Sequence, residues 1–254
     1  MIRVAAVGDV HVGEDSAQIF RPCLERLAEE SDVLLLAGDL TKRGTLSEAR
    51  VLAEDVRDLG TPVIAVLGNH DHEEDGAPDV RRALEDSGVI VLEGECVTLD
   101  TPNGRLGIAG VKGFGGGFAG ASGSSFGERE MKIFMAATEL AAAQLTNALS
   151  SLEADLRVAL LHYAPVPDTL QGERLELYPF LGSYLLAEAI DRVGADLVLH
   201  GHAHRGTEKG LTPGGVPVRN VAQPVIRHPY NIYTLAIGEP PDVTAAPRRG
   251  RTGA

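Results

Sequence analysis

The octapeptide LVLHGHAH, residues 197–204, places three histidines at alternate positions at the end of an apolar run. If the run is a strand, its side chains alternate between two faces, so the three imidazoles share a face only while the strand lasts. Gly201 favours a turn, which would let His202 and His204 project differently from the strand tip. Because neutral imidazole is the commonest metal-ligating side chain, the stretch predicts a metal site, and ordinary core or surface histidines are the alternative.

The composition is that of a globular protein of 254 residues, 44% hydrophobic and 23% charged. We expect residues 1–240 to form one domain, because no linker divides them, and the Pro-, Gly- and Arg-rich tail 241–254 to be disordered. No run approaches the ~20 apolar residues of a membrane helix, and the apolar N-terminal run is too short for a signal peptide. Cys23 and Cys96 show no CxxC spacing. We therefore expect a cytoplasmic protein with no membrane partner.

The charge balance is acidic, with a net charge of -13 at pH 7. The tail contributes the basic residues Arg248, Arg249 and Arg251, so the remainder is more acidic still. Such a protein lacks the electrostatic footprint needed to grip extended nucleic acid. A small anionic substrate stays possible, because a bound metal ion can reverse the local field.

Strands and helices alternate through the first half of the chain. Apolar runs predict strands near 2–7, 33–37, 63–67, 157–161 and 197–199, and further strands near 89–92, 96–100, 106–111, 216–221 and 231–237. Helices are predicted around Leu24–Ala28, after the capping box at Thr45–Glu48, between Pro78 and Gly88, near 128–150 and near 183–193. Strands and helices alternate in the first half of the chain, and strands predominate in the second half. This order indicates an α/β protein with two packed sheets and helices outside.

Potential ligands follow five of these strands. They are Asp9 and His11, Asp39, Asn69 and His70, His162, and finally His202 and His204. Ligands of open α/β sheets bind at the carboxyl ends of the strands, so these side chains are expected to lie together.

The donor set is too large for one tetrahedral zinc ion. Without His70 it comprises two carboxylates, one amide oxygen and four imidazoles. It suits two divalent ions that share a bridging carboxylate. Mixed nitrogen and oxygen donors without thiolate favour Mn, Fe or Zn over Cu(I), Mg or Ca. Two such ions ~3.5–4 Å apart can clamp a phosphoryl group and generate hydroxide for in-line attack.

The ordered motifs resemble those of the calcineurin-like metallophosphoesterase superfamily. They are DVH at 9–11, GD at 38–39 with Gly44 five residues after Asp39, GNHD at 68–71, His162, and GHAH at 201–204. The resemblance implies a four-layer α/β/β/α sandwich of two mixed β-sheets flanked by helices. It implies one metal ion on Asp9, His11 and His204 and another on Asn69, His162 and His202, with Asp39 bridging. The nucleophile would be a metal-bridging hydroxide, and Mn²⁺ is the ion we expect first.

The resemblance also implies a catalytic role for His70, which in the family contacts the phosphate and protonates the leaving group. A cationic imidazole beside a phosphoryl group can stabilise charge and donate a proton near neutral pH. Asp71 would orient His70 or the neighbouring backbone, and the alternative is a simple turn residue.

Other candidates carry less. His200 is either a hydrogen-bond partner of the site or a plain strand residue, and His72 lies in an acidic, solvated loop. Arg227 and His228 could reach the rim of the pocket. The glycine-rich segment 112–127 has no predicted structure. Its formal GxGxxG match opens no helix, so a mobile loop, or a lid over the metal site, is the better interpretation.

These patterns favour an enzyme that hydrolyses a small phosphodiester or phosphomonoester. Leu40 and Thr41 after Asp39 resemble the bacterial branch that includes class III cyclic-nucleotide phosphodiesterases, whereas Tyr163 stands where that branch often has a second histidine. The alternatives are a nuclease on short oligonucleotides and a non-catalytic metal-binding scaffold. The patterns indicate neither the natural substrate nor an oligomeric state.

Overall fold

A computed structural model describes residues 1–238 of the chain. The predicted tail at 241–254 therefore lies outside the described residues, as does the end of the domain predicted to reach residue 240. Within the described part, no helix has the length and apolar character needed to cross a membrane.

The first sheet contains the N-terminal strands. Its order is β13-β1-β2-β3-β4, formed by Asn231–Leu235, Ile2–Val7, Val33–Ala37, Val63–Val66 and Ile90–Val91. β1 to β4 pair in parallel, and β13 runs antiparallel to β1. The apolar runs of β1 to β3 are buried almost throughout, as expected for parallel strands covered on both faces.

The second sheet has the order β11-β12-β10-β9-β6-β5. These strands are Lys209–Leu211, Pro217–Asn220, Leu197–His200, Leu156–Leu161, Gly104–Val111 and Glu95–Thr101. β12, β10, β9 and β6 are parallel, while β11 and β5 are antiparallel edge strands. Both sheets are therefore mixed.

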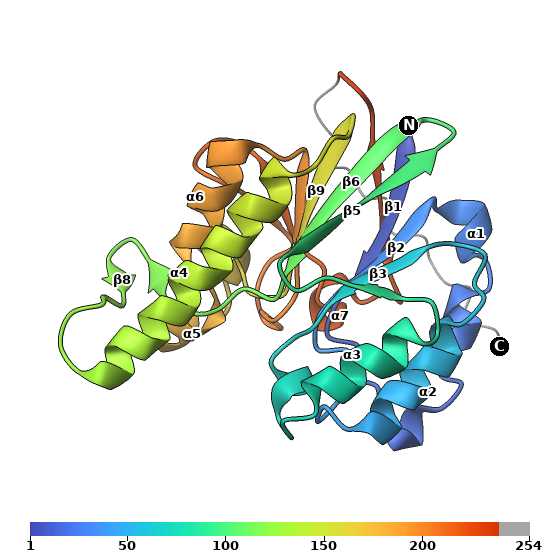
Figure 1. The fold of residues 1–254 in the computed structure, drawn as a ribbon, viewed down its shortest axis with the longest axis horizontal. Coiled ribbons are helices and arrows are strands. Elements are labelled where there is room, and N and C mark those ends of the chain that lie inside the picture. Colours follow the sequence, from blue (N-terminus) through green and yellow to red (C-terminus); the bar gives the residue numbers. More distant parts are fainter. Residues whose placement is uncertain (239–254) are drawn as a thin grey trace.

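The helices cover the outer faces of the two sheets (Figure 1). Short α1 (Leu27–Glu30), α2 (Leu46–Val56) and α3 (Ala77–Glu85) pack on the first sheet, and α4 (Arg129–Ser150) and α6 (Tyr184–Val193) on the second. The connections contain two short helices, α5 (Tyr178–Leu181) and α7 (Gln223–Ile226). They also contain five 3₁₀ turns, η1 to η5, at Glu14–Ser16, Arg21–Leu24, His70–His72, Pro167–Leu170 and Leu175–Leu177.

Alternation along each strand divides the core into layers. In β1, Ala5 and Val7 face the helices, while Ile2, Val4 and Ala6 face the second sheet. Side chains of β6, β9 and β10 in the second sheet pack against them. These are Leu106, Ile108, Leu156, Val158, Leu160, Leu197 and Leu199. The predicted four-layer α/β/β/α sandwich is confirmed.

Local signals match most element boundaries. Thr45 caps α2 by accepting from the Glu48 amide, and Glu48 accepts in return from the Thr45 amide, which completes the predicted capping box. Pro78 lies in the first turn of α3, and Gly194 ends α6 with a positive φ of 93°.

Several segments differ from the prediction. The expected helix around residues 24–28 is a 3₁₀ turn followed by the single α-helical turn α1. The glycine-rich segment 112–127, predicted to be without structure, contains a small hairpin of β7 (Gly117–Phe118) and β8 (Ala121–Ser122). Its Gly116 and Gly117 amides bond to carbonyls of Pro179 and Gly182 around α5, and these long-range contacts hold a segment with no hydrophobic period of its own. β11, α5 and α7 were also not predicted.

Candidate metal centre

The loops after β1, β2, β3, β9 and β10 meet between the two sheets. Parallel pairing brings the strand ends of each sheet to one edge. Hydrogen bonds then join the sheets: Gly8 donates to Val221 O at 2.9 Å, and His162 Nδ1 lies 2.9 Å from Ala37 O. Gly8 and Val221, more than two hundred positions apart in the sequence, thereby become neighbours.

Two overlapping groups of potential ligands lie at this meeting point. Ligand atoms of Asp9, His11, Asp39 and His204 all lie within 4.8 Å of one another, and so do those of Asp39, His162 and His202. His204 Nε2 is 2.8 Å from Asp9 Oδ1, and His162 Nε2 is 3.2 Å from Asp39 Oδ1. Asp39 belongs to both groups.

Asn69 lies at the second group, because its Oδ1 is 3.0 Å from His162 Nε2. The structure thus brings together all seven residues predicted as ligands: Asp9, His11, Asp39, Asn69, His162, His202 and His204.

The donor chemistry of the cluster fits cations. His162 Nδ1 must carry the proton, since Ala37 O can only accept. Burial lowers the pKa of His162 to about 3, so Nε2 is a bare acceptor at neutral pH. It nevertheless faces Asn69 Oδ1 and Asp39 Oδ1. Three acceptors that converge without a proton repel one another, and a cation between them removes that repulsion.

The two buried carboxylates, Asp9 and Asp39, also favour a bound cation. Asp9 is 2% exposed and Asp39 1% exposed, and no lysine or arginine of the described part forms an ion pair with either. Burial raises the pKa of Asp9 to about 6, with the nearby charge of Asp39 adding to the effect of burial. His204 and the backbone amides of His202 and His70 offset part of this buried charge, and coordination of a divalent ion would offset the rest.

Backbone strain accompanies these positions. Asp9, His11, Asp39 and His202 have φ values of 57°, 44°, 49° and 70°, in the left-handed region that side chains with a Cβ rarely adopt. Such residues cluster at functional sites, where the surrounding structure holds them.

Two motif glycines allow the ligands to approach. A Cβ on Gly38 would lie 2.5 Å from His162 Nδ1, and one on Gly68 would lie 2.1 Å from Asp39 Oδ1. No side chain fits at either position, which explains why glycine precedes the ligand motifs after β2 and β3.

Backbone carbonyls orient three of the imidazoles. Ala37 O accepts from His162 Nδ1, Phe180 O lies 3.3 Å from His202 Nε2, and Lys42 O lies 2.7 Å from His70 Nδ1. A hydrogen bond to one ring nitrogen leaves the other for a ligand or substrate. The sequence did not reveal these partners, because a carbonyl carries no residue-specific signal.

His70 lies at the open side of the cluster. Its side chain is 40% exposed, its ring meets that of His11 edge-on at 4.6 Å, and its amide donates to Asp39 Oδ1 at 2.9 Å. With Nδ1 committed to Lys42 O, Nε2 is available to another molecule.

Asp71 lies beneath the cluster and is fully buried. Its Oδ1 accepts from the amide and hydroxyl of Thr41, and its Oδ2 accepts from the amides of Leu40 and Gly68. Burial raises the pKa of Asp71 to about 6, and the same donors oppose that shift. Its contacts join the loops after β2 and β3, which carry Asp39 and Asn69, so the carboxylate positions backbone.

Asp71→Asn is expected to destabilise the protein by about 3 kcal/mol. An amide NH₂ would face the amides of Leu40 and Gly68, and unsatisfied buried donors cost ~1–3 kcal/mol each. Thermal unfolding should show a melting temperature lower by roughly 6–12 °C. Asp79→Asn, at an exposed position of α3, is the matched control. An unchanged melting temperature for Asp71→Asn would contradict the positioning role.

The remaining sequence candidates lie apart from the two groups. His200 is buried, with Nδ1 2.8 Å from Gly201 O and Nε2 2.8 Å from Thr169 Oγ1, so it supports the loop. His72 and Arg227 are exposed and His228 is half-buried, and none belongs to either group of potential ligands. A role of Arg227 and His228 at the rim stays a prediction.

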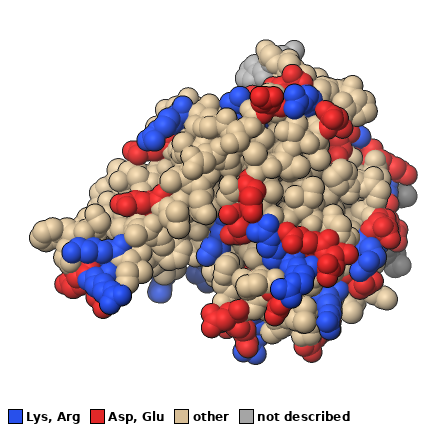
Figure 2. Space-filling view, viewed as in Figure 1, with Lys and Arg blue, Asp and Glu red and all other residues tan. Residues whose placement is uncertain are grey.

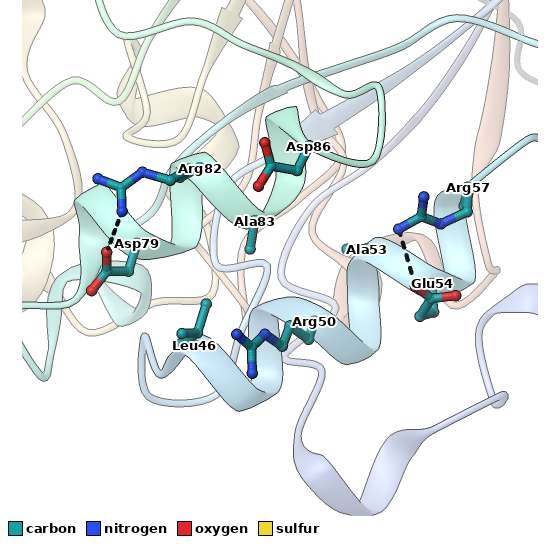
Figure 3. A pocket seen from close by; sticks show the side chains of 9 residues that line it. All are labelled: Leu46, Arg50, Ala53, Glu54, Arg57, Asp79, Arg82, Ala83 and Asp86. Carbon is teal, nitrogen blue, oxygen red and sulfur yellow. Dashed lines mark hydrogen bonds and ion pairs between the residues drawn. The ribbon is translucent and has the colours of Figure 1, made fainter.

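A separate cavity of about 550 Å³ lies between α2 and α3 (Figure 3). Four of its charged side chains form two ion pairs: Arg82 with Asp79 at 3.2 Å and Arg57 with Glu54 at 3.0 Å. None of the potential ligands lines it, so it is distinct from the strand-end cluster.

The part of the chain that carries the potential ligands also matches a known protein family. A family model described as calcineurin-like phosphoesterase matches residues 2–206. A probable cyclic nucleotide phosphodiesterase of Synechococcus sp. is 34% identical over 83 residues, 29% of this chain. The match spans only 32% of that relative's length.

Solved structures share the fold at low identity. Phosphopantetheinyl hydrolase from Mycobacterium tuberculosis superposes with a TM-score of 0.64 and 18% identity, covering 86% of this chain and 88% of the other. A putative 5'-nucleotidase from Staphylococcus aureus gives 0.55 and 14%, covering 94% and 52%.

Proposed function

Since the chain belongs to the calcineurin-like phosphoesterase family, whose members are divalent-metal-dependent hydrolases of phosphoester bonds, we propose that it hydrolyses a small phosphodiester or phosphomonoester. The observation that carries the proposal is the sharing of Asp39 by two groups of ligand atoms. One carboxylate between two such groups is what a pair of metal ions requires.

The proposed ligand assignment follows the two groups. Asp9, His11 and His204 would hold one ion, Asn69, His162 and His202 would hold the other, and Asp39 would belong to both ligand sets. The imidazole-rich set favours Mn²⁺, with Fe or Zn as alternatives. When bound, the two ions supply Lewis-acid polarisation of the phosphoryl oxygens and activation of the attacking water.

His70 is the proposed general acid. Its exposed ring borders the first group through His11, and Lys42 O holds Nδ1, which leaves Nε2 for the leaving-group oxygen. Asp71 acts indirectly, by fixing the backbone on which Asp39 and Asn69 stand.

The relatives suggest a range of small phosphoesters. Their names describe a cyclic nucleotide phosphodiesterase, a phosphopantetheinyl hydrolase and a 5'-nucleotidase. A nuclease on short oligonucleotides is the second candidate, supported by the same phosphodiester chemistry. Extended nucleic acid is not the expected substrate, because the net charge is -13. Acidic and basic side chains are also interspersed on the face drawn in Figure 2.

We further propose a cytoplasmic protein with residues 1–240 as one domain. Both cysteines, Cys23 and Cys96, are free thiols, which suits a reducing compartment.

Purified protein supplied with Mn²⁺ is expected to hydrolyse bis-p-nitrophenyl phosphate, to lose activity with EDTA and to recover it on metal addition. At ~100 times the metal Kd, each bound ion should also raise the melting temperature by roughly 5–10 °C, because the ions bind only the folded state. Absence of hydrolysis of p-nitrophenyl mono- and diesters with Mn, Fe and Zn would overturn the proposed function. A panel of cyclic nucleotides, nucleoside monophosphates and short DNA would separate the candidates.

A further inference from the structure

A sixth strand end, that of β6, also reaches the metal centre. β6 pairs in parallel with β9, and Val111 is the partner of Leu161. Lys112 and His162 follow that last pair, and Lys112 O accepts from the amides of His162 and Tyr163, each at 3.0 Å. Strand register therefore places Lys112 beside a proposed metal ligand.

The side chain of Lys112 also lies on the face of β6 that is directed between the two sheets. Leu106 and Ile108 of β6 point between the sheets, and a Cβ on Gly110 would meet Leu92 and Val66 there. Lys112 continues this alternation toward the space where His162 lies. Its ammonium is 5.7 Å from the ring centre of Phe114, and its side chain is half-buried.

The charge of Lys112 interacts with charged groups of the cluster. Burial lowers the pKa of Lys112, and the negative charges of Glu93, Asp39 and Asp71 oppose this. In the other direction, the charge of Lys112 contributes to the lowered pKa values of His72 and His162. Strand register and these mutual effects both bring Lys112 to the side of the cluster where Asp39 and His162 lie.

Lys112 differs from the other cations around the centre. Lys42 pairs with Asp15 at 2.6 Å, and Arg43 pairs with Glu74. No hydrogen bond or ion pair engages the Lys112 ammonium among the described residues. A half-buried lysine without such a partner gives up hydration that an anionic ligand would replace.

We propose that Lys112 is a substrate-binding residue whose ammonium contacts an anionic phosphoryl oxygen on the second-metal side, opposite His70, and thereby favours dianionic phosphomonoesters over monoanionic phosphodiesters. The proposal rests on the proposed function and specifies its substrate class. An added positive charge attracts a dianion more strongly than a monoanion, so the gain depends on ester charge.

Two esters with the same leaving group test this directly: p-nitrophenyl phosphate and bis-p-nitrophenyl phosphate. In Mn²⁺-loaded protein, Lys112→Met should lower kcat/KM for the monoester about 10- to 100-fold, the range of a charge-assisted hydrogen bond, and for the diester less than about fivefold. Calorimetry with inorganic phosphate should show Kd raised by at least about tenfold. Metal content should stay at the parent level.

Lys112→Arg keeps the charge and should keep most of the preference for the monoester. Lys209→Met, at an exposed position of the edge strand β11, is the matched control and should behave as the parent. Equal losses on both esters, or an unchanged phosphate Kd in Lys112→Met, would overturn the proposal. If the parent hydrolyses neither ester, the proposed function fails, while the phosphate titration still decides whether Lys112 binds an anion.

Discussion

Asp39→Asn is expected to abolish measurable phosphoester hydrolysis, with kcat lower by about 10³ or more. Asp39 is the one carboxylate that belongs to both groups of ligand atoms, and a neutral amide bridges two cations poorly. Metal ions supply several kcal/mol of transition-state stabilisation, and about 4 kcal/mol is roughly 10³ in rate. Elemental analysis should show fewer than two bound ions per chain.

Stability separates this effect from misfolding. Without metal, Asp39 adds buried negative charge beside Asp9, so metal-free Asp39→Asn should melt at or above the temperature of the metal-free parent. The rise in melting temperature on metal addition should be largely lost. Asp79→Asn, exposed on α3, should retain activity and both ions. An Asp39→Asn protein that keeps two ions and parental kcat would contradict the bridging role.

His70→Ala is expected to lower kcat by about 10²–10⁴, the usual range for general acid catalysis, without loss of metal. The loss should depend on the leaving group. p-Nitrophenolate is a stable anion and can leave without being protonated, whereas an alkoxide must be protonated as it leaves. The loss of kcat should therefore be larger for an alkyl phosphoester than for a p-nitrophenyl ester. Steady-state kinetics on both ester types at saturating Mn²⁺ measures the difference.

The neighbouring histidine provides the control. His72 shares the turn η3 with His70 but belongs to neither ligand group, so His72→Ala should keep parental kinetics. If His70→Ala binds both ions and hydrolyses the alkyl ester as fast as the parent, His70 is not the acid.

Much of the architecture could be predicted because it depends on short-range patterns. The apolar runs of β1, β2 and β3 predicted strands, and the capping box and Pro78 located α2 and α3. The ordered motifs selected the residues that gather at the strand ends. The hairpin β7–β8 could not be predicted, because contacts with the α5 region hold it.

Residue roles inside the site depended on distant partners. Asp71 could have been a simple turn residue on sequence grounds, and only its four donors from Leu40, Thr41 and Gly68 reveal it as a clamp between two loops. Lys112 belonged to no motif, and the register of β6 against β9 placed it beside His162.

The sequence by itself therefore determined the strand–helix order, the two-sheet class and the identity of the potential ligands, since periodicity and motif spacing are local properties. The tertiary structure alone decided how LVLHGHAH is divided. His204 meets Asp9 across 195 positions, His202 packs against His162 and is held by Phe180 O, and His200 turns away to Thr169. The physical reason is that side-chain direction at a strand end depends on left-handed backbone turns and on partners from the other sheet.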